Sequence, residues 1–285
     1  MIALLLLAAL VNEPTTHTYS ATSPRNVLDL HLPECDGPHP VLLFVHGGAW
    51  VIGDKQAVGQ KVAFTGDGYA VASCNYRLLA DPRRAKGTAR SSEVATGVAD
   101  QAVDVAAAID WLADHADEFD LDAGRIVLSG HSAGAHLSAL VATDPQYLAV
   151  HNRSPSGLAG VVLIDGAGYD VLQRLADASD KQRRLFEYVF TKDPNTQRQL
   201  SPVTHAAAHA APPVLILHVA DRTESRRQSA SLAEAMRAGG GEARIVPCEG
   251  KTHSSINREL GQPGDPATEE VRRFLLTAAL GGLTD

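Results

Sequence analysis

Short apolar runs alternate along the chain with segments in which apolar residues recur at helical spacing. The runs are typical of strands, which we expect at Val27–Leu32, Val41–Val45, Ala70–Cys74, Ile126–Ser129, Gly160–Ile164, Val214–Val219 and Ala243–Pro247. Two of these runs, VLLFV at 41–45 and VVLI at 161–164, are apolar at every position, as strands covered on both faces usually are. The pattern therefore predicts an α/β fold with a mostly parallel central sheet.

The segments between these strands predict helices on both faces of the sheet. In Val103–His115 the apolar residues recur at the spacing that forms one buried stripe on a helix. Further helices are expected at Ala133–Ala142, Ser225–Ala238 and Ala267–Ala279. Three consecutive glycines, 239–241, suit the end of the helix that precedes them.

One segment, 169–211, departs from this alternation. It is polar, follows a helical pattern over Asp170–Phe190 and contains Pro194 and Pro202. Because it stands between two expected strands, we predict a small lid-like insertion that borders the functional site. Residues 16–285 are then a single domain, since one α/β domain can reach about 250 residues.

Composition and charge narrow the class of protein. The chain has 285 residues, 45% of them apolar and 20% charged, which is typical of a soluble globular protein. Its 33 acidic and 25 basic residues give a net charge of −8, so its field repels polyanions and nucleic-acid binding is not expected. The cysteines, Cys35, Cys74 and Cys248, lack the spacing of a zinc or redox motif and are expected as unpaired thiols, although their pairing stays open.

The N-terminal run Ile2–Val11 is apolar and has about the length of a signal-peptide core. Only the α-amino group supplies positive charge before it, and no clear A-x-A cleavage site follows. Residues 1–15 are therefore either an export signal or a segment that lies against the fold. Export to the periplasm or the outside is favoured over the cytoplasm. The run is too short to span a bilayer, and no stable membrane span is expected.

The strongest chemical signal is the sequence GHSAG at 130–134, between an expected strand and an expected helix. A sharp strand-to-helix turn of this kind exposes the hydroxyl of its central serine, so Ser132 is the candidate nucleophile. The sequence HGG at 46–48 also follows a strand. Its glycines allow backbone N–H groups to approach a developing oxyanion, so Gly47, Gly48 and Ala133 are the candidate donors.

A serine nucleophile needs a histidine base and a carboxylate that orients it, in the chain order Ser, acid, His. Asp221 follows the expected strand Val214–Val219, and His253 follows the next strand along the chain. Both would lie in loops at the carboxyl edge of the sheet. Glu224 is the alternative acid. The sequence therefore predicts a triad of Ser132, Asp221 and His253.

The stretches HGGAW at 46–50, GHSAGAHL at 130–137, HVADRTESRRQS at 218–229 and GKTHSSINRELG at 250–261 resemble the α/β-hydrolase superfamily. The similar group is that of HGGxW-type carboxylesterases, which includes hormone-sensitive-lipase-like, feruloyl-esterase-like and kynurenine-formamidase-like branches. The resemblance covers about residues 16–280 and implies the same six site residues. HVAD is one residue shorter than the commoner HG-x-x-D, which keeps Glu224 open beside Asp221.

These features predict a serine hydrolase that cleaves small carboxylic esters through an acyl-enzyme. Neither a cofactor nor a metal is required, and the expected partner is a small ester or amide substrate; the oligomeric state stays open. An arylformamidase acting on N-formylkynurenine-type amides is the alternative within enzymes. A non-catalytic binding protein with a hydrolase fold is the alternative outside them, although such proteins usually lose the nucleophile or the base.

Overall fold

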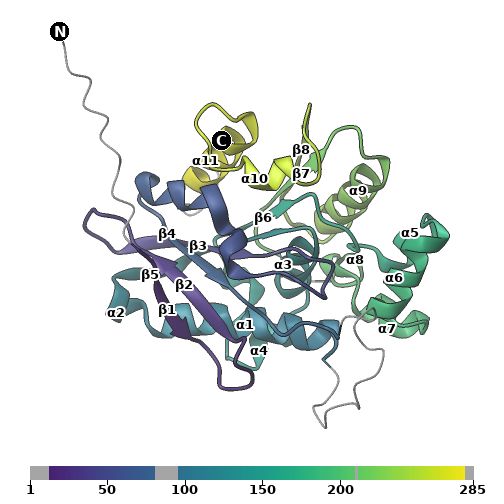
Figure 1. The fold of residues 1–285 in the computed structure, drawn as a ribbon, viewed down its shortest axis with the longest axis horizontal. Helices are drawn as coiled ribbons and strands as arrows, with labels where there is room; N and C mark the ends of the chain where they lie inside the picture. Colours follow the sequence, from purple (N-terminus) through teal and green to yellow (C-terminus); the bar gives the residue numbers. More distant parts are fainter. Residues whose placement is uncertain (1–12, 81–95, 209–210, 280–285) are drawn as a thin grey trace.

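An eight-stranded sheet runs through the molecule in the order β1-β2-β4-β3-β5-β6-β7-β8 (Figure 1). The structure is a computed structural model that describes residues 13–80, 96–208 and 211–279. Its strands are β1 (Thr15–Thr18), β2 (Val27–His31), β3 (His39–Val45), β4 (Ala70–Cys74), β5 (Leu121–His131), β6 (Gly160–Ile164), β7 (Val214–Val219) and β8 (Ala243–Cys248). All neighbouring pairs from β4 to β8 are parallel, and β1 and β2 form an antiparallel edge. The mostly parallel sheet is confirmed.

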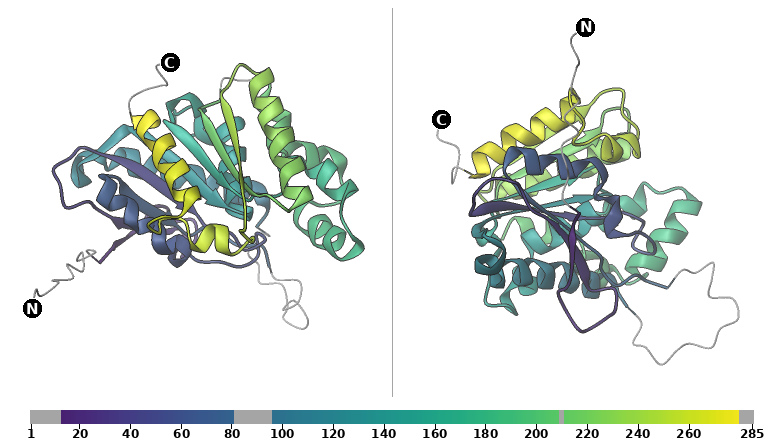
Figure 2. Two further views of the ribbon diagram at one scale, coloured as in Figure 1. Left: turned by 90° about the horizontal axis from the view of Figure 1, so that it is seen from above. Right: turned by 60° about the vertical axis from the view of Figure 1, so that its left-hand side comes forward.

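Helices cover both faces of this sheet (Figure 2). The 3₁₀ segment η1 (Lys55–Asp67) and helix α11 (Pro266–Ala279) pack on one face, while α1 (Val98–Asp114), α3 (Ala133–Thr143) and α9 (Thr223–Ala238) pack on the other. Strand β3 contributes Leu42 and Phe44 to the first face and Val41, Leu43 and Val45 to the second. This alternation explains why the run is apolar at every position. Shorter helices are α2 (Ala116–Phe119), α4 (Gln146–Ala149), η2 (Pro155–Gly157) and α10 (Ser255–Arg258).

The segment between β6 and β7 forms four short helices on one side of the molecule (Figure 1). They are α5 (Val171–Ala176), α6 (Asp180–Phe190), α7 (Pro194–Gln199) and α8 (Pro202–Ala206). Residues 1–12, which carry most of the predicted signal or N-terminal segment, lie outside the described residues. Within the described ranges, no helix has the length and apolarity that crossing a bilayer requires. The three cysteines are free, as expected.

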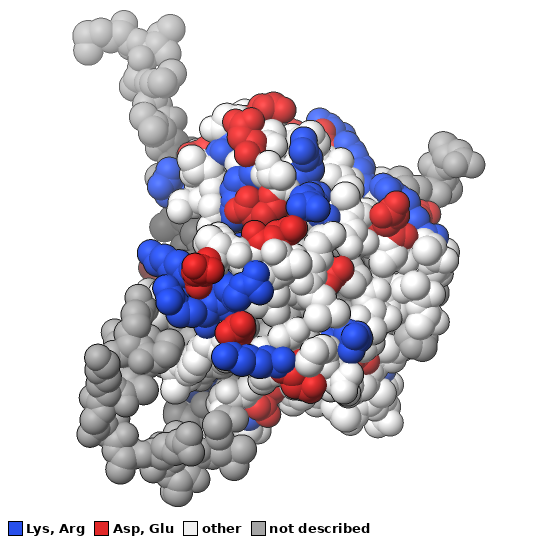
Figure 3. Space-filling model, turned by 90° about the vertical axis from the view of Figure 1, so that its right-hand side faces the viewer, with Lys and Arg blue, Asp and Glu red and all other residues white. Residues whose placement is uncertain are grey.

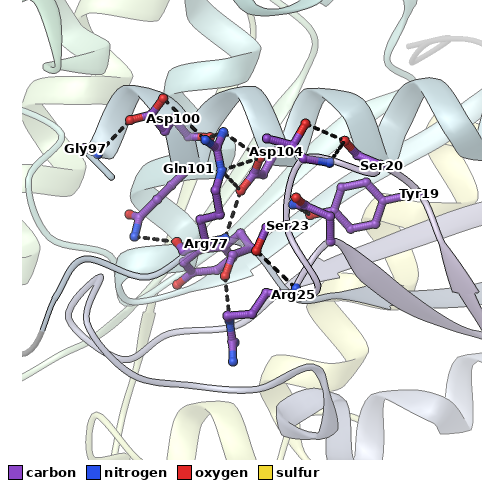
Figure 4. A network of polar contacts seen from close by, with 12 residues as sticks. Tyr19, Ser20, Ser23, Arg25, Arg77, Gly97, Asp100, Gln101 and Asp104 are labelled. Carbon is purple, nitrogen blue, oxygen red and sulfur yellow. Dashed lines mark hydrogen bonds and ion pairs between the residues drawn. The ribbon is translucent and has the colours of Figure 1, made fainter. Parts of the chain in front are cut away.

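A polar network fastens the segment after β4 to helix α1 (Figure 4). The Arg77 guanidinium pairs with Asp104 (2.8 Å) and also contacts Asp100 (3.6 Å). Gln101 Nε2 donates to the carbonyl oxygens of Arg77 and Trp50, both at 2.8 Å. Because Gln101 is fully buried, these bonds fix the backbone of the turn that contains Trp50.

On the side of the molecule that carries the insertion, basic and acidic side chains lie among one another (Figure 3). Lys181 and Arg184 of α6 are exposed. Arg227 of α9 pairs with Asp177 at the end of α5 (3.0 Å), which joins the insertion to α9. An exposed pair of this kind contributes about 0–1 kcal/mol to stability, so the insertion depends mainly on its apolar contacts.

Candidate active site

Ser132 stands in a sharp turn between β5 and α3. Its φ of 55° and ψ of −115° lie in a region that non-glycine residues rarely adopt, at a cost of about 1–3 kcal/mol. Its N–H donates to Ile164 O (2.9 Å), which fastens the turn to β6. A Cβ on Gly134 would lie 2.1 Å from Val45 O, and one on Gly130 would lie 2.4 Å from the backbone of Gly134. The GHSAG pattern is thus explained by close packing around a partly exposed serine.

His253 approaches Ser132 from the loop after β8, and its Nε2 lies 3.1 Å from Ser132 Oγ. The His253 carbonyl accepts a hydrogen bond from His131 Nε2 (2.9 Å). Lys61 Nζ donates to Asn257 O (2.8 Å) in the short helix α10 that follows this loop. Burial and the neighbouring His253 lower the pKa of His131 to about 3, so His131 is a neutral donor. The predicted Ser132 and His253 are therefore brought together, and hydrogen bonds fasten the chain both at His253 and in the helix that follows it.

The carboxylate that reaches His253 belongs to Asp165, not to the predicted Asp221. Asp165 Oδ2 lies 2.6 Å from His253 Nδ1. Asp221 is exposed in the turn after β7, and Glu224 pairs with Arg222 (3.0 Å). The prediction of Asp221 as the orienting acid, and of Glu224 as its alternative, is corrected by this geometry.

The physical reason is the arrangement of neighbouring strands. Strands β6 and β7 are parallel, with Ile164 paired to Leu217, so residues just beyond either strand end reach the same edge of the sheet. Asp165 directly follows β6 and satisfies the chain order Ser, acid, His as well as Asp221 does. Two features of the sequence could have pointed to Asp165 as the acid: it directly follows the apolar run GVVLI, and the HVAD pattern before Asp221 is shorter than usual.

Asp165 is a fully hydrogen-bonded carboxylate with no exposed side-chain surface. Oδ1 accepts from Val219 N (3.1 Å) and from the Ser225 hydroxyl, and Oδ2 accepts from Arg222 Nη1 as well as facing His253. Burial alone would raise the pKa of Asp165. The hydrogen bonds from His253 and Ser225 and the charge of Arg222 outweigh burial and hold this pKa well below its usual range. Asp165 is therefore an anion at neutral pH.

Two of the three predicted oxyanion donors lie close to Ser132, since Ala133 directly follows it and Gly47 packs against it. Gly48 has a φ of +124°, and a Cβ on Gly47 would lie 3.1 Å from Ser132 Cβ. In the part of the chain that the structure describes, the N–H groups of Gly47, Gly48 and Ala133 have no hydrogen-bond acceptor. Ala133 begins helix α3, whose first N–H groups lack partners within the helix. Within the described residues, these three N–H groups are thus left without a backbone acceptor, as the prediction of oxyanion donors requires.

The insertion contacts this site through a buried histidine. Trp50 Nε1 donates to His136 Nδ1 (3.3 Å), and His136 Nε2 donates to Leu200 O (2.8 Å). Burial lowers the pKa of His136 to about 4, which agrees with one acceptor and one donor nitrogen. The rings of Phe186 and Phe190 meet Trp50 edge-on, with centroid distances of 5.9 and 4.9 Å. The insertion thus borders the turn that holds the oxyanion donors.

The arrangement can perform acyl transfer. A carboxylate lies against Nδ1 of an imidazole, and the imidazole leaves Nε2 to accept the proton of a serine hydroxyl. Gly47 and Ala133, whose N–H groups are candidate donors, are next to that serine. Across residues 13–80, 96–208 and 211–279, no group of three or more His, Cys, Asp or Glu side chains is arranged to hold a metal ion.

Comparisons with known proteins agree with the fold and identify the family. The BD-FAE family model matches residues 28–236. Among curated relatives, a probable isoprenylcysteine alpha-carbonyl methylesterase of Arabidopsis thaliana is 29% identical over 90% of this chain and 54% of its own length. Esterase LipC of Mycobacterium tuberculosis is 32% identical over 70% of this chain and 49% of its own length. The chain thus spans about half the length of these relatives.

Among solved structures, esterase 2 of Thermogutta terrifontis phosphonylated by sarin superimposes with a TM-score of 0.76. It is 24% identical, and the match covers 96% of this chain and 98% of that one. This likeness confirms the α/β-hydrolase fold expected from the sequence. Because the family model covers most of the sheet and both the HGGAW and GHSAG turns, the chain belongs to the BD-FAE family.

Proposed function

We propose that the protein is a serine carboxylesterase that hydrolyses small esters, with Ser132 as nucleophile, His253 as base and Asp165 as the acid that orients the base. The observation that carries the proposal is the pair of contacts at the imidazole, 3.1 Å to Ser132 Oγ and 2.6 Å to Asp165 Oδ2. Its matched relatives named as esterases support ester hydrolysis as the reaction.

The first half of the reaction acylates the enzyme. His253 Nε2 accepts the proton of Ser132 while Oγ attacks the ester carbonyl carbon, and the carbonyl oxygen becomes negative. The N–H groups of Gly47, Gly48 and Ala133 stabilise this oxygen. The tetrahedral species then expels the alcohol, which takes the proton from Nε2, and the acyl group remains on Oγ.

The second half repeats these steps with water. His253 accepts a proton from water, the resulting hydroxide attacks the acyl carbon, and Oγ leaves with the proton returned by Nε2. Throughout, Asp165 accepts the Nδ1–H bond and stabilises the imidazolium that forms twice in each turnover.

We expect the site beside Ser132 to favour a short acyl group. Trp50, Phe186 and Phe190 are all at most 5% exposed and pack against one another, so they fill the region between the oxyanion turn and α6. Each buried methylene contributes about 0.8 kcal/mol only where there is space to receive it. We therefore expect acetyl to butyryl esters to react faster than decanoyl esters.

The test combines a substrate series with labelling of the nucleophile. The kcat/KM values of p-nitrophenyl esters from acetyl to dodecanoyl are compared with that for N-formylkynurenine, and Ser132→Ala serves as the inactive control. Loss of the nucleophile should lower kcat about a millionfold. A fluorophosphonate should label Ser132 alone. Label on another serine would contradict the triad, and faster turnover of N-formylkynurenine would make the protein an arylformamidase.

A further inference from the structure

Arg222 lies in the turn after β7, between the two acids that the sequence had suggested, and it contacts both Asp165 and His253. Its Nη1 donates to Asp165 Oδ2 and lies 2.7 Å from His253 Nδ1. Its Nη2 lies 3.0 Å from Glu224 Oε1, which holds the guanidinium from the other side. The Arg222 side chain is 29% exposed, so its charge is only partly screened by water.

The hydrogen-bond chemistry makes Arg222 and His253 donors to the same oxygen, Asp165 Oδ2. An arginine has donors and no acceptor, and Nδ1 must also donate if Nε2 is to accept the serine proton. Arg222 and His253 therefore cannot bond to each other in the reactive tautomer. Both can donate to Asp165 Oδ2, which carries two lone pairs.

The charges around His253 determine how the shared contact affects protonation of the imidazole. Three ionisable groups lie against the His253 ring: Asp165 just after β6, Arg222 in the turn after β7, and the ring of His131. A fourth, the ammonium group of Lys61, acts on His131. The ring centroids of His131 and His253 are 4.6 Å apart, but His131 is neutral. Glu224 reaches His253 only through Arg222. The groups in direct contact with Nδ1 are thus one anion and one cation.

We propose that Arg222 is a positioning residue of the active site: it holds the Asp165 carboxylate in line with His253, and its charge partly offsets the attraction of that carboxylate for a proton on the imidazole. This inference rests on the proposed function. A triad acid both orients the imidazole and favours its protonated form. In this site Asp165 orients the imidazole, while Arg222 limits how strongly Asp165 favours protonation of the ring.

The two roles predict different effects when Arg222 is changed. Arg222→Met removes the charge and the hydrogen bond to Asp165 but keeps a long side chain. The acid limb of the kcat/KM profile should move to higher pH by about one unit, since a neighbouring charge commonly shifts an ionisation by one to three units. The plateau kcat should fall as well, because Oδ2 loses the donor that fixes its position. KM should change little.

Arg222→Lys restores a positive charge without the planar fork of the guanidinium. It should return the acid limb toward the wild-type pH while leaving the plateau kcat reduced. Glu224→Gln should move the acid limb slightly to lower pH, because it removes an anion that partly neutralises Arg222. Arg226→Met is the matched control, since Arg226 is an exposed arginine on the same helix. It changes the net charge equally and should leave the profile where it was.

A second measurement does not depend on activity. In the Ser132→Ala background, with and without Arg222→Met, the His253 ring is titrated by ¹⁵N NMR, with circular dichroism to verify the fold. Protonation should occur at higher pH when Arg222 is absent. If Ser132→Ala abolishes turnover but Arg222→Met leaves both the acid limb and the NMR titration in place, Arg222 has no such role and the triad stands. If Ser132→Ala retains activity, the proposed function itself fails.

Discussion

Replacement of Asp165 by asparagine tests the assignment of the acid most directly, because Asp221→Asn makes the same chemical change one strand away. In Asp165→Asn, one side-chain orientation sets the amide N–H₂ against Arg222 and His253, and the other sets it against the Val219 N–H. The first orientation forces Nδ1 to accept, so the proton moves to Nε2 and the imidazole can no longer take the proton of Ser132. The second keeps the tautomer but removes the anion.

The size of the effect follows from the distance. An imidazolium and a carboxylate separated by 2.6 Å attract each other by about 6 kcal/mol at an effective dielectric constant of ~20. Loss of that attraction corresponds to a factor of about 10⁴ in rate. The neighbouring Arg222 cation reduces the field at the ring, so this value is an upper limit.

The assay is kcat for p-nitrophenyl butyrate at the pH plateau, with circular dichroism to compare the folds. We expect Asp165→Asn to lower kcat by a factor on the order of 10⁴, and Asp221→Asn to change it less than about threefold. Glu224→Gln should also retain most of the plateau rate. The assignment of Asp165 is refuted if Asp221→Asn is the more damaging change, or if Asp165→Asn keeps more than about a hundredth of the rate.

Three further predictions concern the oxyanion turn, the buried histidines and the insertion. Gly47→Ala puts a methyl group 2.9 Å from His131 O and 3.1 Å from Ser132 Cβ. The value of kcat should therefore fall at least about 10²-fold, while the fluorophosphonate still labels Ser132. An unchanged kcat would show that Gly47 is not part of the oxyanion site. Burial lowers the pKa of His136 to about 4, so between about pH 6.5 and that value the unfolded chain takes up a proton that the folded chain does not. His136 alone should therefore lower the free energy of unfolding, measured in urea, by up to about 3 kcal/mol over this range, and His136→Gln should remove this part of the pH dependence while the part due to the buried His46 and His131 remains. Arg174 is 4% exposed, lies 4.6 Å above the Phe186 ring and has no hydrogen bond or ion pair among the described residues. Arg174→Met should therefore leave the free energy of unfolding unchanged or raise it by about 1 kcal/mol. A decrease above about 2 kcal/mol would show that the buried charge stabilises the insertion.

The strands were predictable wherever burial on both faces imposed an unbroken apolar run. Gly160–Ile164 and Val214–Val219 agree with the structure at both ends. Strand β1, with the sequence TTHT, was missed because an exposed edge strand needs no apolar pattern. The segment η1 was missed because its apolar residues have no helical periodicity and Gly59 interrupts it.

The site was predictable where a local backbone shape demands a particular residue. The turn at Ser132 requires small neighbours, and the approach of Gly47 to Ser132 Cβ requires glycine, so both motifs could be recognised. The acid was not predictable in this way. Either of two adjacent parallel strands can deliver a carboxylate to the same point, and only the long-range contact between Asp165 and His253 distinguishes them.

Strand β8 lies at the edge of the sheet, and its burial is incomplete: only Cys248 among its six residues is buried. An edge strand with few buried side chains opens at a lower free energy than the centre of a sheet. His253 follows this strand, whereas Ser132 and Asp165 follow central ones. The base can therefore detach from an otherwise folded molecule, so in rising denaturant the enzyme should become inactive before it unfolds. Catalytic activity would then measure the local stability of strand β8. Substitutions that add contacts on β8 should raise the temperature at which activity is lost more than substitutions in the core that stabilise the protein by the same free energy.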